Sequence, residues 1–174
     1  VWKESTFDFL ADVFAETFAL FPSKYIHIGG DEAKYDRWKA WPHCQKRKKE
    51  LNLKEEKERQ VYFNARVQQM VKKYGKTIVG WDEIIEDGLK DKAVGMIWHN
   101  KEKALKAVSA GHYSVMNLSD YSYFDAPESD IPGELKAATW IKPISLEKAY
   151  SLNPMLNGLD EKYRPQILGA EGSL

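Results

Sequence analysis

Five short apolar runs alternate along this chain with segments of helical periodicity, and this alternation limits the fold more than any other feature. Each run is short enough to be a strand, and none shows the clean alternation of a sheet with one wet face. Parallel strands covered by helices on both faces produce this pattern. The sequence therefore predicts an α/β fold with strands at 24–28, 77–81, 93–98, 113–118 and 166–174.

The segments between these runs predict helices and one long irregular excursion. Ser5 and Asp8 resemble a capping box at the start of an amphipathic helix. The charged run at 46–60, which we expect to be a solvated helical face, leads into a second amphipathic helix. A third helix is expected at 101–110. Residues 119–164, where prolines concentrate, are expected to be partly structured, and loops of that length usually carry function.

Composition narrows the classes of function. A chain of 174 residues, 43% of them hydrophobic, has the size of one domain with a sizeable core. Its 26 basic and 26 acidic side chains cancel, so no basic field favours nucleic acid as a partner. No apolar run approaches the roughly 20 residues that cross a bilayer, so we expect no membrane span. The single cysteine, Cys44, has no internal disulfide partner and is expected to be a buried or incidental thiol.

Polar and aromatic residues follow the predicted strands at their carboxyl ends. Asp31 and Glu32 come after the first strand, and Trp81, Trp98 and Asn117 stand at the ends of the next three. In barrels of parallel strands the active site gathers at these ends. Two neighbouring carboxylates leaving a strand can face different parts of one substrate, although surface Asp-Glu pairs without a catalytic role are common. Position after a double glycine favours the catalytic interpretation, because glycine lets a ligand approach the backbone closely.

Tryptophans are the second indication of function. Sugar rings present apolar C–H faces that stack on indole rings, and acetamido methyl groups fit small aromatic boxes. Trp81, Trp98 and Trp140 are candidates for such contacts, with packing as the alternative. Packing or surface coverage is the simpler interpretation for the other three tryptophans, Trp2, Trp38 and Trp41.

Five ordered segments resemble the catalytic domain of glycoside hydrolase family 20, the β-N-acetylhexosaminidases. They are HIGGDE from His27, GWDEI from Gly80, MIWHN from Met96, YFDA from Tyr123 and ILGAEGSL from Ile167. The resemblance implies a TIM (β/α)8 barrel, of which this chain would supply roughly strands 4 to 8 with the intervening helices. Residues 1–174 would then be the C-terminal portion of the catalytic barrel, truncated at both ends, because a complete barrel takes about 250 residues.

The resemblance also implies a retaining, substrate-assisted reaction, in which the 2-acetamido oxygen of the substrate is the nucleophile. Glu32 matches the general acid/base, and Asp31 matches the residue that orients the acetamido group and stabilises its positive charge. Tyr123 matches a hydroxyl that binds the acetamido oxygen, and Asp125 a carboxylate that holds a sugar hydroxyl. The acetamido box would be walled by Trp81 and Trp98 and flanked by Trp140.

Some residues of the family pattern differ or are missing. His99 and Asn100 stand where many relatives carry an arginine-containing turn. The arginine that grips the sugar belongs to an earlier strand, and a tryptophan and a glutamate are expected just after Leu174. His27 belongs to the motif, where its expected role is structural.

The partners implied by the resemblance are glycans or glycoconjugates with a terminal N-acetylglucosamine or N-acetylgalactosamine. The resemblance implies no cofactor and no metal. It favours a secreted, periplasmic or lysosomal location for the enzyme. One alternative is a metal-dependent hydrolase with His27, Asp31 and Glu32 as ligands, which the lack of another well-spaced histidine argues against. A second is a non-catalytic carbohydrate-binding or structural fragment, because five strands alone would leave an open sheet edge. We expect the isolated 174 residues to be inactive.

Overall fold

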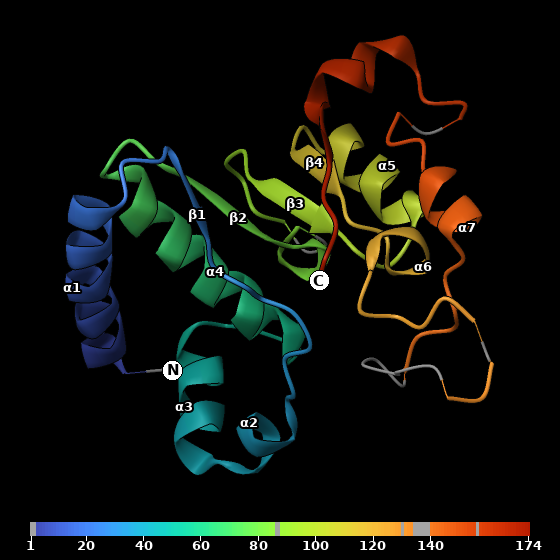
Figure 1. The fold of residues 1–174 in the computed structure, drawn as a ribbon. Helices are drawn as coiled ribbons and strands as arrows, with labels where there is room; N and C mark the ends of the chain where they lie inside the picture. The colour runs from blue at the N-terminus through green and yellow to red at the C-terminus, as the bar shows by residue number, and fades with distance from the viewer. Residues whose placement is uncertain (1–2, 86–87, 130, 134–139, 156) are drawn as a thin grey trace. The chain divides into compact units, whose positions relative to one another are not determined.

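The computed structural model describes residues 3–85, 88–129, 131–133, 140–155 and 157–174. The chain forms two compact units, Val1–Ala93 and Val94–Leu174. Each unit contains parallel strands and the helices that precede, connect or follow them in the chain (Figure 1).

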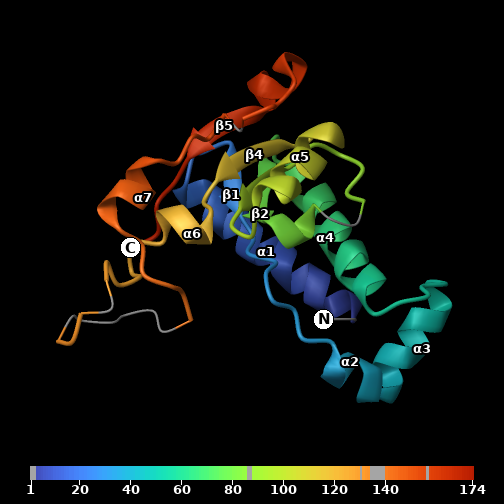
Figure 2. The same cartoon turned by 90° about the vertical axis from the view of Figure 1, so that its right-hand side faces the viewer.

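The first unit is built on two parallel strands, β1 (Tyr25–His27) and β2 (Thr77–Trp81). Helix α4 (Lys57–Lys72) lies between them in sequence and packs against β2, and α1 (Glu4–Leu20) packs against α4 (Figures 1 and 2). The β-branched run of β2 suits a pleated strand, and the turn after α4 uses Gly75 at a φ of 68°. Buried apolar side chains between these elements form the core, among them Phe7, Val67, Val71 and Ile78.

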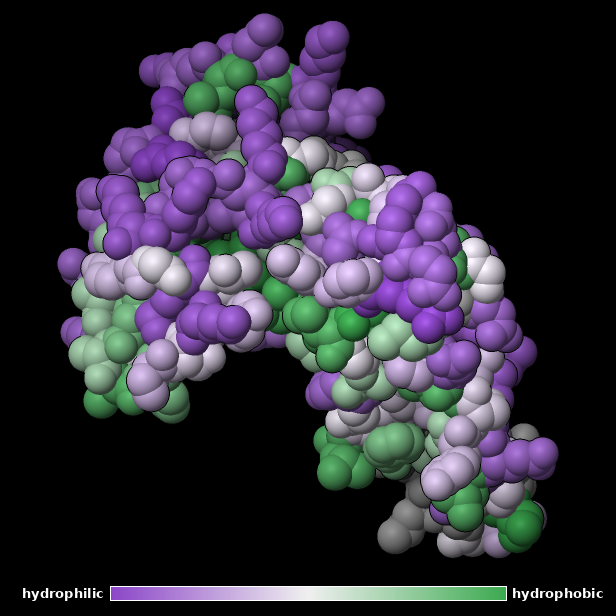
Figure 3. All heavy atoms as spheres, turned by 90° about the horizontal axis from the view of Figure 1, so that it is seen from above, coloured by the Kyte–Doolittle hydropathy of each residue, from purple (hydrophilic) through white to green (hydrophobic). Residues whose placement is uncertain are grey.

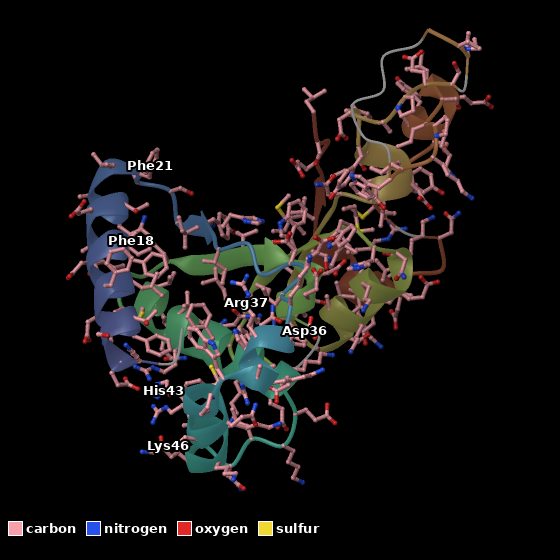
Figure 4. All side chains as sticks on the ribbon, turned by 90° about the horizontal axis from the view of Figure 1, so that it is seen from below. Phe18, Phe21, Asp36, Arg37, His43 and Lys46 are labelled. Carbon is pink, nitrogen blue, oxygen red and sulfur yellow. The ribbon has the colours of Figure 1, made fainter. Side chains whose placement is uncertain are left out.

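A pair of short helices, α2 (Asp36–Ala40) and α3 (Pro42–Glu50), stands between β1 and α4 in the sequence. Figure 4 labels Asp36 and Arg37 on α2 and His43 and Lys46 on α3. The two helices contact each other, and Cys44 of α3 is 3% exposed, as expected for a buried thiol.

The expectation that residues 46–60 form a solvated helical face is correct only in part, because side chains such as Lys46, Lys49 and Glu50 are exposed but the segment is not one helix. The segment is divided between α3 and the first turn of α4, and Arg59 within it is fully buried. The Arg59 guanidinium donates to the carbonyl oxygen of Trp38 at 3.1 Å and forms an ion pair with Glu56 at 2.8 Å. A buried charge needs such partners, so Arg59 and Glu56 tie α2 to α4.

The second unit has three parallel strands in the order β3 (Val94–Ile97), β4 (Tyr113–Met116) and β5 (Ile167–Ala170). Helix α5 (Lys101–Ser109) packs against β3 and β4. The Asn100 side chain caps α5 by accepting a hydrogen bond from the Lys103 amide at 3.1 Å. The buried face of α5 presents Ala104 and Val108 to the core.

Between β4 and β5 the chain makes the long excursion that the prolines predict. Its regular pieces are α6 (Ser119–Ser122), α7 (Leu146–Tyr150) and the 3-10 helix η2 (Glu161–Gln166). Helices α6 and α7 contact each other and lie side by side in Figures 1 and 2. The excursion is therefore partly structured, as expected.

All five predicted strands are present; β2 has the predicted bounds, and the other four are shorter than their apolar runs. The predicted capping box is wrong, because α1 begins at Glu4 and both Ser5 and Asp8 lie inside the helix. The N-cap residue is Lys3, whose side chain makes no capping bond within the described residues. Glu4 in the first turn instead pairs with Arg47 and Arg66, at 2.7 and 2.9 Å. A carboxylate also suits the positive end of the helix dipole.

Hydrophobic side chains remain exposed on α1 and just after it. Phe9, Leu20 and Phe21 are 64%, 75% and 62% exposed. Figure 4 labels Phe18 and Phe21 at the C-terminal end of this helix, and Figure 3 shows hydrophobic side chains reaching the visible surface. Across the described part of the chain, every helix is too short or too polar to cross a bilayer.

Candidate active site

The carboxylates Asp31 and Glu32 lie on a tight turn that follows β1. Gly29 and Gly30 have φ values of 69° and 101°, which glycine adopts without the steric penalty of a side chain. Glu32 has a φ of 47°, a left-handed conformation that costs other residues about 1–2 kcal/mol. Such backbone persists where surrounding contacts enforce it. Both carboxylates are exposed, as a group that meets a substrate must be.

Three elements of the first unit bond to this turn. From β2, the Trp81 amide donates to the Gly29 carbonyl oxygen at 3.0 Å. From α4, the Gln60 side-chain amide donates to the Gly30 carbonyl oxygen at 2.6 Å. The Glu32 amide points to Oε1 of Glu83 at 3.5 Å, in the 3-10 helix η1 (Asp82–Ile84). The turn is therefore held from the strand side and from the helix side.

Close packing also fixes the turn. A Cβ atom on Gly30 would lie 2.2 Å from Cγ2 of Ile84, and one on Gly80 would lie 2.7 Å from the Gly29 carbonyl oxygen. Neither position has room for a side chain. Gly30 and Gly80 therefore let β1, β2 and η1 approach one another at the point where the carboxylates emerge.

His27 connects the end of β1 to its own turn and to Trp81. Its Nδ1 accepts a hydrogen bond from the Gly29 amide at 3.1 Å, and its ring meets the Trp81 ring edge to face at 5.3 Å. Burial lowers the pKa of His27 below its ordinary value of 6.5, while the negative charge of Asp31 acts in the opposite direction. Both the lowered pKa and the bond that Nδ1 accepts favour the neutral form of the imidazole.

Aromatic side chains gather in the second unit after β3 and β4. Trp140 meets Trp98 at a ring distance of 6.4 Å and 89°, and Tyr123 at 5.7 Å and 83°. Trp98 directly follows β3 and also lies against the His99 ring, at 3.8 Å. The indole of Trp140 is 63% exposed, so this cluster presents aromatic surface that is open to a ligand.

Asp125 stands two residues beyond Tyr123. One of its carboxylate oxygens, Oδ1, is buried and has no hydrogen-bond partner among the residues that the structure describes. A buried polar atom without a partner is costly and calls for an explanation such as a bound ligand.

Ser173, which sequence reasoning did not single out, holds the segment that carries Tyr123. It forms a bridge with Tyr123, its carbonyl oxygen accepts from the Phe124 amide at 2.7 Å, and its amide donates to the Ser122 carbonyl oxygen at 2.8 Å. Asn117 adds a side-chain bond to the Ser173 hydroxyl at 3.0 Å. The position of Asn117 at a strand end was a signal for this contact, but nothing in the pattern indicated Ser173.

The seven predicted site residues divide between the two units. The first unit holds Asp31, Glu32 and Trp81; the charge of Asp31 acts on His27, and the Trp81 ring packs against it. The second unit brings Trp98, Tyr123 and Trp140 into one cluster and places Asp125 near it in sequence.

Parallel strands with acids and aromatic rings at their carboxyl ends place this chain among the α/β proteins that build their sites at strand ends. The whole chain, residues 1–174, matches the family model described as glycosyl hydrolase family 20, catalytic domain. The chain therefore belongs to glycoside hydrolase family 20, as its motifs predict.

Its relatives bear the corresponding name. A β-hexosaminidase of Porphyromonas gingivalis is 39% identical over 173 residues, which are 99% of this chain and 22% of that protein. A β-hexosaminidase of Akkermansia muciniphila is 32% identical, over 97% of this chain and 33% of that protein. The chain thus spans between a fifth and a third of the length of these relatives.

Solved structures of the family share the fold. A family 20 exo-β-N-acetylglucosaminidase from Vibrio harveyi, in complex with N-acetylglucosamine, has a TM-score of 0.87 and 31% identity over 97% of this chain and 26% of its own. A β-N-acetylhexosaminidase from Bacteroides fragilis has a TM-score of 0.82 and 31% identity, over 99% of this chain and 35% of its own. The predicted α/β fold, as part of this family's barrel, is confirmed.

Proposed function

We propose that residues 1–174 are the C-terminal portion of the catalytic barrel of a β-N-acetylhexosaminidase, an enzyme that removes terminal β-linked N-acetylhexosamine with retention of configuration. The observation that carries the proposal is the exposed Asp31-Glu32 pair on a turn fixed from three sides at the end of β1. Membership of the family and the names of the relatives support it.

In the first step of this mechanism Glu32 donates a proton to the glycosidic oxygen, and the bond from that oxygen to the anomeric carbon breaks. The acetamido oxygen of the substrate forms a bond to the same carbon and gives an oxazolinium ring. Asp31, as a carboxylate, orients the acetamido N–H and stabilises the positive charge that develops. In the second step Glu32 removes a proton from water, which attacks the anomeric carbon and reopens the ring.

The geometry of the turn supports different roles for the two acids. Adjacent residues leave a chain in different directions, and the left-handed backbone of Glu32 turns the chain sharply after Asp31. One carboxylate can therefore face the bond to be broken while its neighbour faces the acetamido group.

The second unit supplies groups that suit the sugar. The phenol of Tyr123 donates to the acetamido oxygen, and the indoles of Trp98 and Trp140 offer faces for the acetamido methyl and the ring. Trp81, beside His27 in the first unit, supplies another indole. The buried Oδ1 of Asp125, which has no hydrogen-bond partner in the described part of the chain, supports a bond with a sugar hydroxyl.

The role of Glu32 is tested by Glu32→Gln in the whole protein, with release of nitrophenol from 4-nitrophenyl N-acetyl-β-glucosaminide as the assay. Loss of a general acid/base lowers kcat by about 10²–10⁴-fold. Glu16→Gln, the same change at an exposed position of α1, is the control and should leave kcat unchanged. Turnover by Glu32→Gln equal to wild type would exclude the proposed role.

Substrate assistance is tested separately with N-fluoroacetyl substrates. Each added fluorine withdraws electrons from the acetamido oxygen, so the rate should fall steadily from acetyl to trifluoroacetyl. A rate that does not depend on fluorine would point to a protein nucleophile instead.

We also propose that the 174 residues are inactive without the rest of the protein. The exposed side chains of Phe9, Leu20 and Phe21 and the partial coverage of the relatives support this. The test compares the isolated chain with the whole protein at equal concentration, with light scattering to follow association. Self-association without turnover is expected, and efficient hydrolysis by a monomeric isolated chain would refute the proposal.

A further inference from the structure

We propose that Gln60 is a positioning residue for the acid pair, acting as a hydrogen-bonded clip across the turn that carries Asp31 and Glu32. Its side-chain amide nitrogen donates to the Gly30 carbonyl oxygen at 2.6 Å. Its amide oxygen accepts a hydrogen bond from the Tyr35 hydroxyl at 2.7 Å. The inference rests on the proposed function of that pair.

The two bonds of Gln60 fall on opposite flanks of the pair. Gly30 precedes Asp31 directly, and Tyr35 follows Glu32 by three residues. One planar amide therefore connects the chain before the carboxylates to the chain after them, and it uses both its donor and its acceptor to do so.

The bond to Gly30 fixes the peptide plane from which Asp31 begins. The Gly30 carbonyl and the Asp31 amide share one rigid plane, so an anchored oxygen sets the direction of the next residue. Gly30 itself would permit this plane to rotate, because glycine restricts its backbone little. The Trp81 amide binds the preceding carbonyl, that of Gly29, and leaves the Gly30 carbonyl to Gln60.

The helix that carries Gln60 is well anchored at this end. Gln60 lies in the first turn of α4 and is half-buried. Its neighbour Arg59 is fully buried and bonds to the Trp38 carbonyl oxygen and to Glu56. Of these consecutive residues of α4, Arg59 holds α2 and Gln60 holds the turn. The anchored helix therefore fixes the position of the turn that carries the acids.

Gln60→Met keeps the length of the side chain and removes both hydrogen bonds. We expect kcat to fall about 10–100-fold, because displacement of a catalytic group by about 1 Å has costs of that order. KM should stay within about threefold, since Gln60 is placed to orient the acids rather than to bind the sugar. Gln69→Met is the matched control, the same change at an exposed position of the same helix.

Gln60→Glu separates positioning from a merely structural role. The carboxylate form still accepts from Tyr35 but has no proton to donate to the Gly30 carbonyl oxygen, whereas the protonated form can make both bonds. The ratio of the variant's kcat to that of wild type should therefore rise as pH falls through about 4 to 5, where carboxyl groups gain their proton. Tyr35→Phe, which removes the donor to Gln60, should lower kcat in the same direction by a smaller factor.

The outcomes are distinct. A wild-type protein that hydrolyses no aryl N-acetylhexosaminide would overturn the proposed function and this inference together. An active wild type with Gln60→Met folded and within twofold of its kcat would overturn this inference alone. If Gln60→Met fails to fold, by circular dichroism and thermal melting, Gln60→Glu and Tyr35→Phe decide. The positioning role of Gln60 would be overturned if the activity ratio of Gln60→Glu did not depend on pH and the kcat of Tyr35→Phe equalled that of wild type.

Discussion

Cγ2 of Ile84 fills the space that a side chain on Gly30 would need, at 2.2 Å from the position of an added Cβ. The Gly30 backbone also has a φ of 101°, which side-chain-bearing residues rarely adopt. Two independent constraints therefore require glycine immediately before the carboxylate pair. They also make Ile84, an apolar residue of η1, part of the support of the turn.

Gly30→Ala should destabilise the protein and abolish activity. The left-handed backbone costs about 1–2 kcal/mol and overpacking against Ile84 about 1–3 kcal/mol more. Gly88→Ala is the control, because Gly88 has the same φ of 101° but nothing within 4 Å of an added Cβ. Thermal unfolding and kcat are measured for both. Equal losses for the two variants would show that contact with Ile84 contributes nothing.

Gly172→Ala tests the segment that carries Tyr123. A Cβ on Gly172 would lie 2.4 Å from Cε2 of Phe124, while the glycine backbone is not left-handed. Because the Phe124 ring is 50% exposed, we expect it to move aside at a cost within about 1 kcal/mol in stability and with a rise in KM. Combining the change with Phe124→Leu should recover part of both losses. A double variant worse than the sum of the single ones would contradict this explanation.

Arg59→Met should destabilise the α2–α4 region, because the buried Arg59 bond to the Trp38 carbonyl oxygen is lost and Glu56 is left with Lys48, at 3.0 Å, as an ion-pair partner. Breaking a buried ion pair costs about 3–5 kcal/mol when the remaining charge has no partner, so the pair with Lys48 should hold the loss to the lower end of that range. Arg47→Met is the control. The Arg47 pair with Glu4 has side chains 25% and 58% exposed and is worth about 0–1 kcal/mol. The midpoint of thermal unfolding is measured for both variants and for wild type. A smaller drop in the midpoint for Arg59→Met than for Arg47→Met would contradict the prediction.

The titration of His27 should depend on Asp31. Burial places the pKa of His27 below 6.5 and Asp31 raises it, so Asp31→Asn should lower it further. The fold favours neutral His27, so this residue's contribution to stability is present above pH 6.5 and is lost as pH falls towards the folded-state pKa. NMR of ¹³C-labelled histidine follows the titration. The pKa of His112, lowered by burial alone, should not respond to Asp31→Asn.

Local pattern was enough to predict the strands and the positions of Asp31 and Glu32. The apolar run at 77–81 forms a strand with one buried and one half-buried face, and strand ends then place the acids and tryptophans. The start of α1 was not predictable from Ser5 and Asp8, because the partners that make Glu4 the first residue lie on α3 and α4, far along the chain.

The supports of the site were harder to predict than its acids. Gln60 stands in a charged run that looks solvated, and its role depends on where α4 lies relative to Gly30. Ile84 and Gly80 are residue types that are common in any core, so their type alone does not indicate that they support the site. Ser173 bonds to residues about fifty positions away in the chain. Spacing along one sequence contains no information on such pairs, which depend on tertiary packing.

Cys44, the only cysteine of the chain, is packed into α3 at 3% exposure. A thiol reagent can modify it only after α3 opens, so the rate of labelling measures how often that local opening occurs. The Cys44 thiol is thus a natural reporter of local opening in the α2–α3 region, and no probe has to be introduced. The rate of Cys44 labelling in the Arg59→Met protein would give the free energy of opening of this region. That value is separate from the free energy of unfolding of the whole molecule.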